Sequence, residues 1–421
     1  MNDFSRRYFI KRLAQAGAIT ATSSLWLPAI ASTKSAAHVV VIGGGFGGSV
    51  CAKYIKLFDS SIKVTLIEPS KNFITCPLSN TVLAGINKID FITHSYDQLA
   101  AKYGINIINS VADDIDPISQ KVILPDGKKL QYDHLVVSPG IDFRKQIEGY
   151  DSKTMPHAWK AGPQTLLLRK QLNAMKNGGV FIIAPPVKPF RAPPAPYERA
   201  SLVAHYFSKK NIKAKILIVD PSDSFSKQEL FMSAWKKLYP GMIEWIKDSP
   251  VKRVNNRAME IVTTSGKTYK GDVINIIPPQ QAGLILQRAG LAEQNGWCRV
   301  NQKTFESNKQ KNIHIIGDAS IAGDMPKTGH AANSQAKICA AAIVSNLNGS
   351  KMPEPSYSSS IYSLLNPKYA ISLAAVYRLI NGRISEVSGG DSPLKAKKKI
   401  RLKEAKYAAG WYKSITADMF F

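Results

Sequence analysis

The chain has 421 residues, which is long enough for two or three domains with substantial cores. Hydrophobic residues make up 44% of the sequence and charged residues 20%, which argues against disorder throughout. The formal net charge of +26 favours an anionic substrate, partner or surface. No nucleic-acid-binding motif accompanies this charge, so we expect no nucleic-acid partner.

The first residues, 1–31, have the features of an export signal. Arg6 and Arg7 form a close twin-arginine pattern, and a mildly apolar stretch, residues 13–30, follows them. Residues 29–31 fit a small-x-small cleavage site. A short basic amphipathic helix is the alternative interpretation. We predict export to the periplasm by the twin-arginine route. We expect no transmembrane anchor in the mature chain, because no later apolar stretch is long enough to span a bilayer.

Residues 38–42 (HVVVI) predict a buried parallel strand, and a glycine-rich turn follows them directly. Gly43, Gly45 and Gly48 fit the pattern G-x-G-x-x-G. In this pattern the first glycine allows a tight turn and the second lets a pyrophosphate approach the backbone. The third lets the next helix, expected over 49–57, pack close to the strand. The N-terminal N–H groups of that helix would face the phosphate.

A second strand, expected over 63–68, completes this unit. It ends in Glu68, which lies 20 residues after Gly48, where an acidic side chain accepts the ribose hydroxyls of a dinucleotide. Strand, glycine turn, helix, strand and terminal acid together predict a dinucleotide-binding unit. The alternative is a glycine turn in an ordinary βαβ unit.

The chain has four cysteines, and no two of them have the close spacing of a known motif. Cys51 and Cys339 lie in expected helices and are interpreted as core residues, whereas Cys298 has no obvious partner. There is no C-x-x-C-H sequence, so this chain attaches no c-type haem itself, and we expect no metal site. Cys76 differs from the others because it follows the ribose-binding strand.

The stretch around Cys76, residues 73–80 (FITCPLSN), resembles the flavoprotein subunit of flavocytochrome c sulfide dehydrogenase. Five further stretches also match this family and extend the resemblance over nearly the whole mature chain: 155–165, 193–201, 277–280, 296–298 and 332–335. The resemblance implies that Cys76 carries FAD covalently through an 8α-S-thioether.

The resemblance also implies an α/β fold of the glutathione-reductase-like FAD architecture, with two dinucleotide-binding (Rossmann-like) domains and a C-terminal interface domain. We expect the FAD-binding domain over 32–149 and 276–348. The second nucleotide-type domain would cover 150–275, and the domain that contacts the cytochrome would cover 349–421.

The second domain is expected to be degenerate and to bind no NAD(P)H. Its first strand, over 179–184, is followed by the proline-rich residues 185–191 instead of a glycine-rich turn. Prolines remove N–H donors, and no glycine allows a phosphate to approach. The next strand ends in Asp220, but the phosphate loop is missing. The alternative is that an unusual loop still binds the nucleotide.

The FAD domain is expected to close with a strand over 312–316 that delivers Gly317 and Asp318 to the flavin. In this architecture the aspartate hydrogen-bonds the ribityl or pyrophosphate region, and a buried cap of the strand end is the alternative. A helix of small residues, expected over 330–347, would place its N-terminus near the flavin pyrimidine. Its partial positive charge would stabilise the anionic reduced flavin.

The family's redox-active disulfide is absent from this chain. Its two positions correspond to Ala192 and Ile361. In the family, a sulfide nucleophile attacks the disulfide, and the liberated thiolate passes electrons to the flavin. Glu198 keeps the position of an active-site carboxylate, and Arg191 flanks the same loop. Glu198 is a candidate acid or base, and an ion pair with Arg191 or Arg199 is the alternative.

The last segment contains an expected strand over 371–378 and a basic run over 395–403. The run is either a solvated face or a docking patch. Residues 407–421 are rich in aromatics and resemble the interface-forming C-terminus of the family.

Two functional classes follow. The first is a periplasmic FAD-dependent oxidoreductase that passes electrons from a small sulfur-containing donor through FAD to a c-type cytochrome, either a subunit or a soluble cytochrome c. The second is a non-catalytic or altered-substrate flavoprotein subunit that keeps the fold but lacks the disulfide. An NADH dehydrogenase is disfavoured by the second domain.

Overall fold

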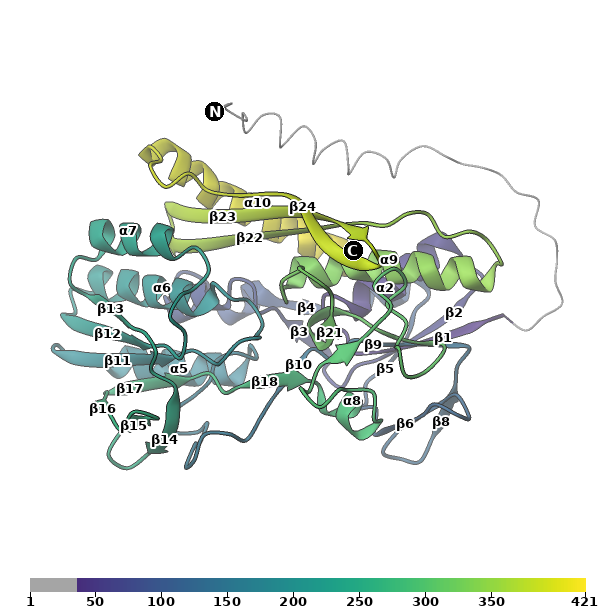
Figure 1. Ribbon diagram of the computed structural model, residues 1–421, viewed down its shortest axis with the longest axis horizontal. Helices are drawn as coiled ribbons and strands as arrows, with labels where there is room; N and C mark the ends of the chain where they lie inside the picture. Colours follow the sequence, from purple (N-terminus) through teal and green to yellow (C-terminus); the bar gives the residue numbers. More distant parts are fainter. Residues whose placement is uncertain (1–35) are drawn as a thin grey trace. The chain divides into compact units, whose positions relative to one another are not determined.

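The computed structural model describes residues 36–421, which form a mixed α/β fold (Figure 1). The predicted export signal and its cleavage site lie outside the described residues. None of the helices within residues 36–421 combines the length and the apolar character needed to cross a bilayer.

The strand expected over 38–42 forms the centre of a five-stranded parallel sheet. In spatial order the strands are β20 (Ile313–Ile315), β9 (His134–Val137), β1 (His38–Ile42), β2 (Lys63–Ile67) and β5 (Asn106–Ile108). Val39, Val40 and Val41 expose no surface, as expected for a central parallel strand that is covered on both faces. β20 joins this sheet from far along the chain, and Gly317 follows it.

Two helices pack against each other beside this sheet: α2 (Gly48–Phe58) and α9 (Gly329–Leu347). Small residues along α9 allow the close approach, and Thr328 caps its N-terminus by accepting a hydrogen bond from the N–H of Ala331. Cys51 of α2 and Cys339 of α9 are fully buried in this core. Their interpretation as packing residues is confirmed.

The second parallel sheet has four strands, which lie in the order β13 (Ile243–Ile246), β12 (Ala214–Val219), β11 (Gly179–Ala184) and β17 (Val273–Ile276). Three helices belong to the same part of the chain: α5 (Pro163–Ala174), α6 (Ala195–Lys209) and α7 (Gln228–Leu238). The predicted α/β class with two Rossmann-like sheets is therefore confirmed.

The shorter elements connect these sheets. The short strands are β3 (Asn72–Ile74), β4 (Thr93–Ser95), β6 (Asp114–Asp116), β7 (Lys121–Ile123), β8 (Lys129–Gln131), β10 (Ile141–Phe143), β14 (Val251–Asn255), β15 (Glu260–Thr263), β16 (Thr268–Lys270), β18 (Gln280–Ala282), β19 (Cys298–Arg299) and β21 (Ser320–Ile321). The short helices are α3 (Ser79–Leu83), α4 (Asp97–Tyr103) and α8 (Leu284–Arg288), with 3₁₀ turns at Ile89–Ile92 and Gly317–Ala319.

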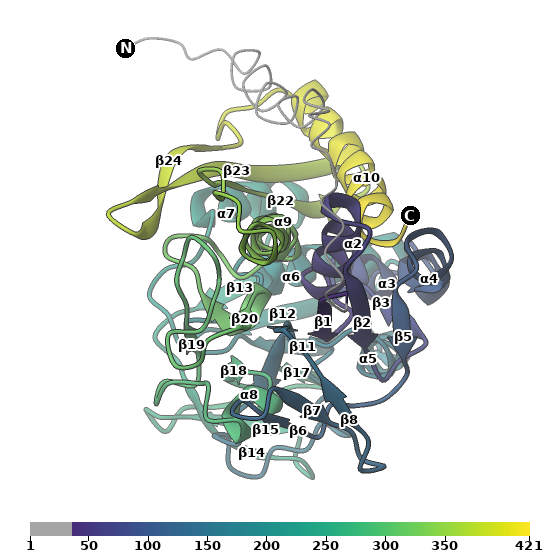
Figure 2. The same ribbon diagram turned by 90° about the vertical axis from the view of Figure 1, so that its right-hand side faces the viewer.

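The C-terminal segment forms an antiparallel sheet of β22 (Ser356–Asn366), β23 (Tyr369–Ile380) and β24 (Arg383–Asp391), followed by the helix α10 (Lys398–Phe420). The strand expected over 371–378 is confirmed as part of β23. α10 packs against β22, β23 and α2 (Figure 2). The sequence reasoning did not predict α10.

Side chains of other elements satisfy part of the unpaired edge of β22, which has β23 on one side only. The N–H of Ser358 donates to Ser334 Oγ at 3.1 Å, and the N–H of Ser360 donates to His330 Nδ1 at 2.8 Å. Both acceptors lie on α9. Edge N–H groups need partners when they are buried, so these bonds hold the C-terminal sheet against α9.

The basic run proves to be mixed. Lys398, Lys399 and Lys403 are exposed, whereas Arg401 is only 2% exposed and forms an ion pair with Glu404 at 3.1 Å. Arg401 therefore belongs to the core of the C-terminal segment, and neither a solvated face nor a docking patch describes it. Its burial follows from the helical spacing of α10, which places every third or fourth residue inward.

Candidate active site

The glycine turn has the geometry that the motif predicts. Gly43 has φ +95°, and a Cβ atom there would clash with the carbonyl oxygen of Ser138. A Cβ at Gly48 would clash with the carbonyl oxygen of Gly43, because α2 starts close against the turn. At Gly45 a Cβ would meet only the ring of Phe73, at 3.7 Å. Atoms of the protein itself therefore exclude a side chain at Gly43 and at Gly48. At Gly45 they do not, and close approach of a ligand to the backbone explains the glycine there.

Glu68 lies directly after β2, beside this turn. Its Oε2 accepts a hydrogen bond from the N–H of Gly44 at 2.8 Å, and its Oε1 accepts one from the N–H of Ser70 at 3.0 Å. The carboxylate is therefore held next to the glycine turn, where a dinucleotide ribose would lie. Its contact with the ribose stays a prediction.

Asp318 has a buried carboxylate oxygen that is unpartnered among residues 36–421. This oxygen, Oδ1, accepts no hydrogen bond there, while Oδ2 lies 4.0 Å from Arg191 Nε. Burial raises the pKa of Asp318 above its usual range. A strand-end cap would accept a backbone N–H, which Oδ1 does not. An orphaned acceptor after Gly317 instead fits a hydroxyl donor of a bound FAD, such as the ribityl chain.

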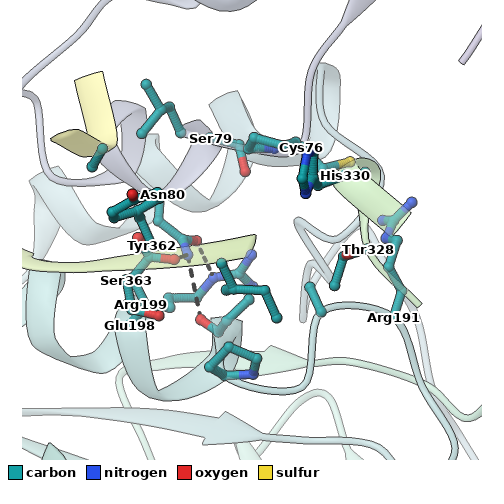
Figure 3. Close-up of a pocket in the computed structure, with 18 of the residues that line it drawn as sticks. Cys76, Ser79, Asn80, Arg191, Glu198, Arg199, Thr328, His330, Tyr362 and Ser363 are labelled. Carbon is teal, nitrogen blue, oxygen red and sulfur yellow. Dashed lines mark hydrogen bonds between the residues drawn. The ribbon is translucent and has the colours of Figure 1, made fainter. Parts of the chain in front are cut away.

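Four of the residues singled out in the sequence border one cavity of about 110 Å³ (Figure 3). They are Cys76, Glu198 and the two positions of the missing disulfide, Ala192 and Ile361. They come from α6, from β22 and from the segments before α3 and α6. Only the tertiary structure brings them together, since the first and last are separated by most of the described chain. Arg191 also lines this cavity.

Glu198 lies in the first turn of α6, where prolines cost no helix hydrogen bond. Asn80 Nδ2 donates to its Oε2 at 3.2 Å, and the N–H of Leu364 on β22 donates to its Oε1 at 3.0 Å. Burial raises the pKa of Glu198 to about 7, although both hydrogen bonds oppose this shift. A carboxyl group with this pKa can accept and release a proton near neutral pH.

The ion-pair alternative for Glu198 is not found within residues 36–421. Arg199 is fully buried, and its hydrogen bonds go to other groups than Glu198. Its Nε donates to Asn80 Oδ1 at 3.0 Å, and its terminal nitrogens donate to Asn275 Oδ1 and to backbone carbonyls. Asn80 thus donates to Glu198 and accepts from Arg199, as the dashed lines in Figure 3 show. Arg191 makes its only carboxylate contact in the described residues with Asp318.

Cys76 lies at the cavity with its thiol directed to the backbone. Its Sγ donates to the carbonyl oxygen of Trp159 at 3.4 Å, and a guanidinium nitrogen of Arg191 donates to the same oxygen. Cys76 is partly exposed, whereas Cys51, Cys298 and Cys339 are buried away from the cavity. Among the described cysteines, Cys76 is therefore the one that a ligand in the cavity can reach.

The sequence reasoning missed part of the cavity wall. Ser360, Tyr362 and Ser363 of β22 line it, as do Trp411 of α10 and His330 at the start of α9. Within the described part of the chain, the indole nitrogen of Trp411 and Ser363 Oγ are buried without a hydrogen-bond partner. His330 Nδ1 accepts from Ser360, so its proton lies on Nε2, and burial lowers the pKa of His330 to about 4. For Trp411, the sequence signal that could have revealed its place was the helical spacing of the buried residues across 398–420.

In the second domain, three groups already hold the carboxylate of Asp220 after β12. Tyr197 Oη donates to it at 2.5 Å, Trp245 Nε1 at 2.9 Å and the N–H of Ser222 at 2.9 Å. Prolines line a neighbouring cavity of about 120 Å³ at the ends of β11 and β12. Asp220 therefore has a structural role, which supports the hypothesis that this domain does not bind a nucleotide.

Three family models match the chain. The central part of "Sulfide dehydrogenase [flavocytochrome c] flavoprotein chain" matches residues 165–278, and "Flavocytochrome c sulphide dehydrogenase, flavin-binding" matches residues 353–420. "Pyridine nucleotide-disulphide oxidoreductase" matches residues 37–170. The flavin-binding match covers β22 and α10, which wall the cavity.

Among curated proteins, the flavoprotein chain of sulfide dehydrogenase from Chlorobaculum thiosulfatiphilum is 61% identical over 45 residues, 11% of this chain and 94% of that sequence. The sulfide-quinone reductase of Aquifex aeolicus is 26% identical over 341 residues, which cover 74% of this chain and 77% of that protein. The solved structure of sulfide:quinone oxidoreductase from Aquifex aeolicus aligns with a TM-score of 0.74 at 22% identity and covers 91% of this chain and 92% of that one.

The glycine turn, the orphaned Asp318 acceptor and these matches define an FAD-dependent oxidoreductase built on two Rossmann-like domains. Within that class, the chain belongs to the family of the flavoprotein chain of flavocytochrome c sulfide dehydrogenase.

Proposed function

We propose that this protein takes two electrons from a small sulfur-containing donor bound in the cavity and passes them through FAD to a c-type cytochrome. The observation that carries the proposal is Glu198, a half-buried carboxyl group with a pKa of about 7 in the cavity that Cys76 also borders. The printed names of the relatives, which act on sulfide, support a sulfur donor. Cytochrome partnership rests on family membership.

When bound, FAD would supply a two-electron acceptor that passes its electrons on singly. The turn at Gly43–Gly48 and the carboxylates Glu68 and Asp318 would hold it. Oxidation of two hydrosulfide ions to one hydrodisulfide ion (HSS⁻) forms an S–S bond, breaks one S–H bond and releases two electrons and one proton, and bound FAD would accept the two electrons. Glu198 takes up the released proton at its carboxylate, while Asn80 and the N–H of Leu364 keep that carboxylate oriented.

The donor cannot react through a protein disulfide of the family type, because Ala192 and Ile361 carry no sulfur. Both side chains nevertheless border the cavity. The donor sulfur therefore reaches the flavin directly. The basic charge of the chain favours an anionic donor such as hydrosulfide, which still carries a proton that Glu198 can take.

The experiment is anaerobic reduction of the purified flavoprotein by sulfide, polysulfide, sulfite, thiols and NADH, followed by flavin absorbance. We expect a sulfur donor to reduce the flavin and NADH not to. The double variant Ala192→Cys plus Ile361→Cys should react faster with sulfide than the parent, provided that the two Cα atoms lie within about 7 Å. Each single variant should not.

No reduction by any donor would sink the proposal and favour the second candidate, a non-catalytic flavoprotein subunit. Reduction by NADH would overturn our interpretation of the second domain. The absence of both cysteines is the observation that favours the second candidate.

We also propose that the protein is exported to the periplasm, on the basis of the paired arginines at 6 and 7. Changing both residues to lysine is expected to leave an unprocessed precursor in the cytoplasm, visible by immunoblot of cell fractions. Normal accumulation of the processed form in the periplasm would contradict this route.

A further inference from the structure

A buried lysine stands behind the cavity wall. Lys227 directly precedes α7 in the left-handed conformation, with φ +61°, and is 8% exposed. Its Nζ lies 3.5 Å from the carbonyl oxygen of Ile361, to which it donates. Ile361 borders the cavity, so Lys227 contacts a residue of the cavity wall.

Lys227 and Glu198 both form hydrogen bonds with the backbone of β22. Lys227 donates to the carbonyl of Ile361, and Glu198 accepts from the N–H of Leu364, three residues further along β22. These two opposite charges therefore fix the stretch of β22 that forms the wall. A buried ammonium group is costly unless anions compensate it.

Three carboxylates from three elements face Lys227: Asp391 at the end of β24, Glu198 on α6 and Glu404 on α10. Glu404 is already bound to Arg401 Nη1 at 3.1 Å and to the hydroxyl of Ser392. Asp391 is exposed to solvent. Glu198 is thus the carboxylate at the cavity on which the charge of Lys227 acts.

We propose that Lys227 is a positioning residue that favours the anionic form of Glu198 and keeps β22 at the cavity wall. This inference rests on the proposed role of Glu198 as a base. The charges agree with it: burial lowers the pKa of Lys227 to about 8, and Glu198 is among the groups that oppose this shift. Lys227 in turn opposes the rise in the pKa of Glu198, as does Arg199.

The test is an infrared titration of the Glu198 carboxyl band in the FAD-loaded protein, with the band assigned by its loss in Glu198→Gln. In Lys227→Met we expect the midpoint to rise by about one pH unit, a tenfold change in proton affinity. Lys227→Arg should restore the parental midpoint. Lys236→Met, on the exposed face of α7, is the matched control and should leave the midpoint unchanged. An unchanged midpoint in Lys227→Met overturns the proposal.

If Lys227→Met loses its FAD, the same titration of Glu198 in the variant Asp391→Asn tests the proposal instead. Removing this exposed anion leaves more of the lysine's field acting on Glu198, so the midpoint should fall, and no change would overturn the proposal. The titration needs no electron donor. If no donor reduces the flavin, the proposed function is refuted. The inference about Lys227 is then still decided by the infrared titration.

Discussion

Glu198→Gln is expected to slow reduction of the flavin by the sulfur donor at least about 100-fold, because positioned acid–base groups contribute factors of this size. The amide cannot take the proton from the donor. It is nearly isosteric, so FAD content should stay at the parental level. The measurement is the anaerobic rate of flavin bleaching in a stopped-flow instrument, with FAD content determined in parallel.

The same variant should change the pH dependence. In the parent, the pKa of Glu198 is about 7, so the active carboxylate is lost as the pH falls through 7. Below that point, protonation of Glu198 should add a drop of about tenfold per pH unit to the drop that protonation of the donor itself causes. Glu198→Gln should show only the drop caused by the donor. Glu229→Gln, an exposed carboxylate on α7, is the control. A parental rate and profile in Glu198→Gln would remove this residue from the mechanism.

Cys76→Ala is expected to abolish covalent attachment of FAD completely. Cys76 is the described cysteine at the cavity, and its thiol lies 3.4 Å from the Trp159 carbonyl. After denaturation and acid precipitation, the parent should keep its yellow colour in the pellet and carry the mass of one FAD. The variant should release free FAD into the supernatant while still binding it when folded.

Cys298→Ala is the matched control, because this cysteine is fully buried and does not border the cavity. It should keep the flavin attached. Free FAD in the supernatant of the parent would refute the covalent link and leave non-covalent binding intact.

Local sequence patterns predicted the parts of the fold that local physics controls. The β-branched run of β1 indicates a strand that is covered on both faces, as in a parallel sheet, and Gly43 and Gly48 admit no side chain. The small residues of α9 likewise indicated a closely packed helix. These features depend on backbone sterics and on burial pattern, which a short stretch of sequence contains.

The C-terminal helix was missed for a physical reason. Residues 398–420 are mixed in polarity, and their buried set includes the charged Arg401 and Glu404. Compensation between these two charges, and not hydrophobicity, permits their burial. A pattern that searches for apolar faces therefore treats this segment as solvated.

The sequence by itself determined the dinucleotide turn, the α/β class, the candidate residues Cys76 and Glu198, and the loss of both redox cysteines. Only the tertiary structure decided which of these residues meet. It also decided that Glu198 is bound by Asn80 and Leu364 instead of an arginine, and that Lys227 stands behind it. The reason is that the protonation of Glu198 depends on burial, on hydrogen bonds from Asn80 and Leu364 and on the charge of Lys227, and these residues are distant in sequence and come together only after folding.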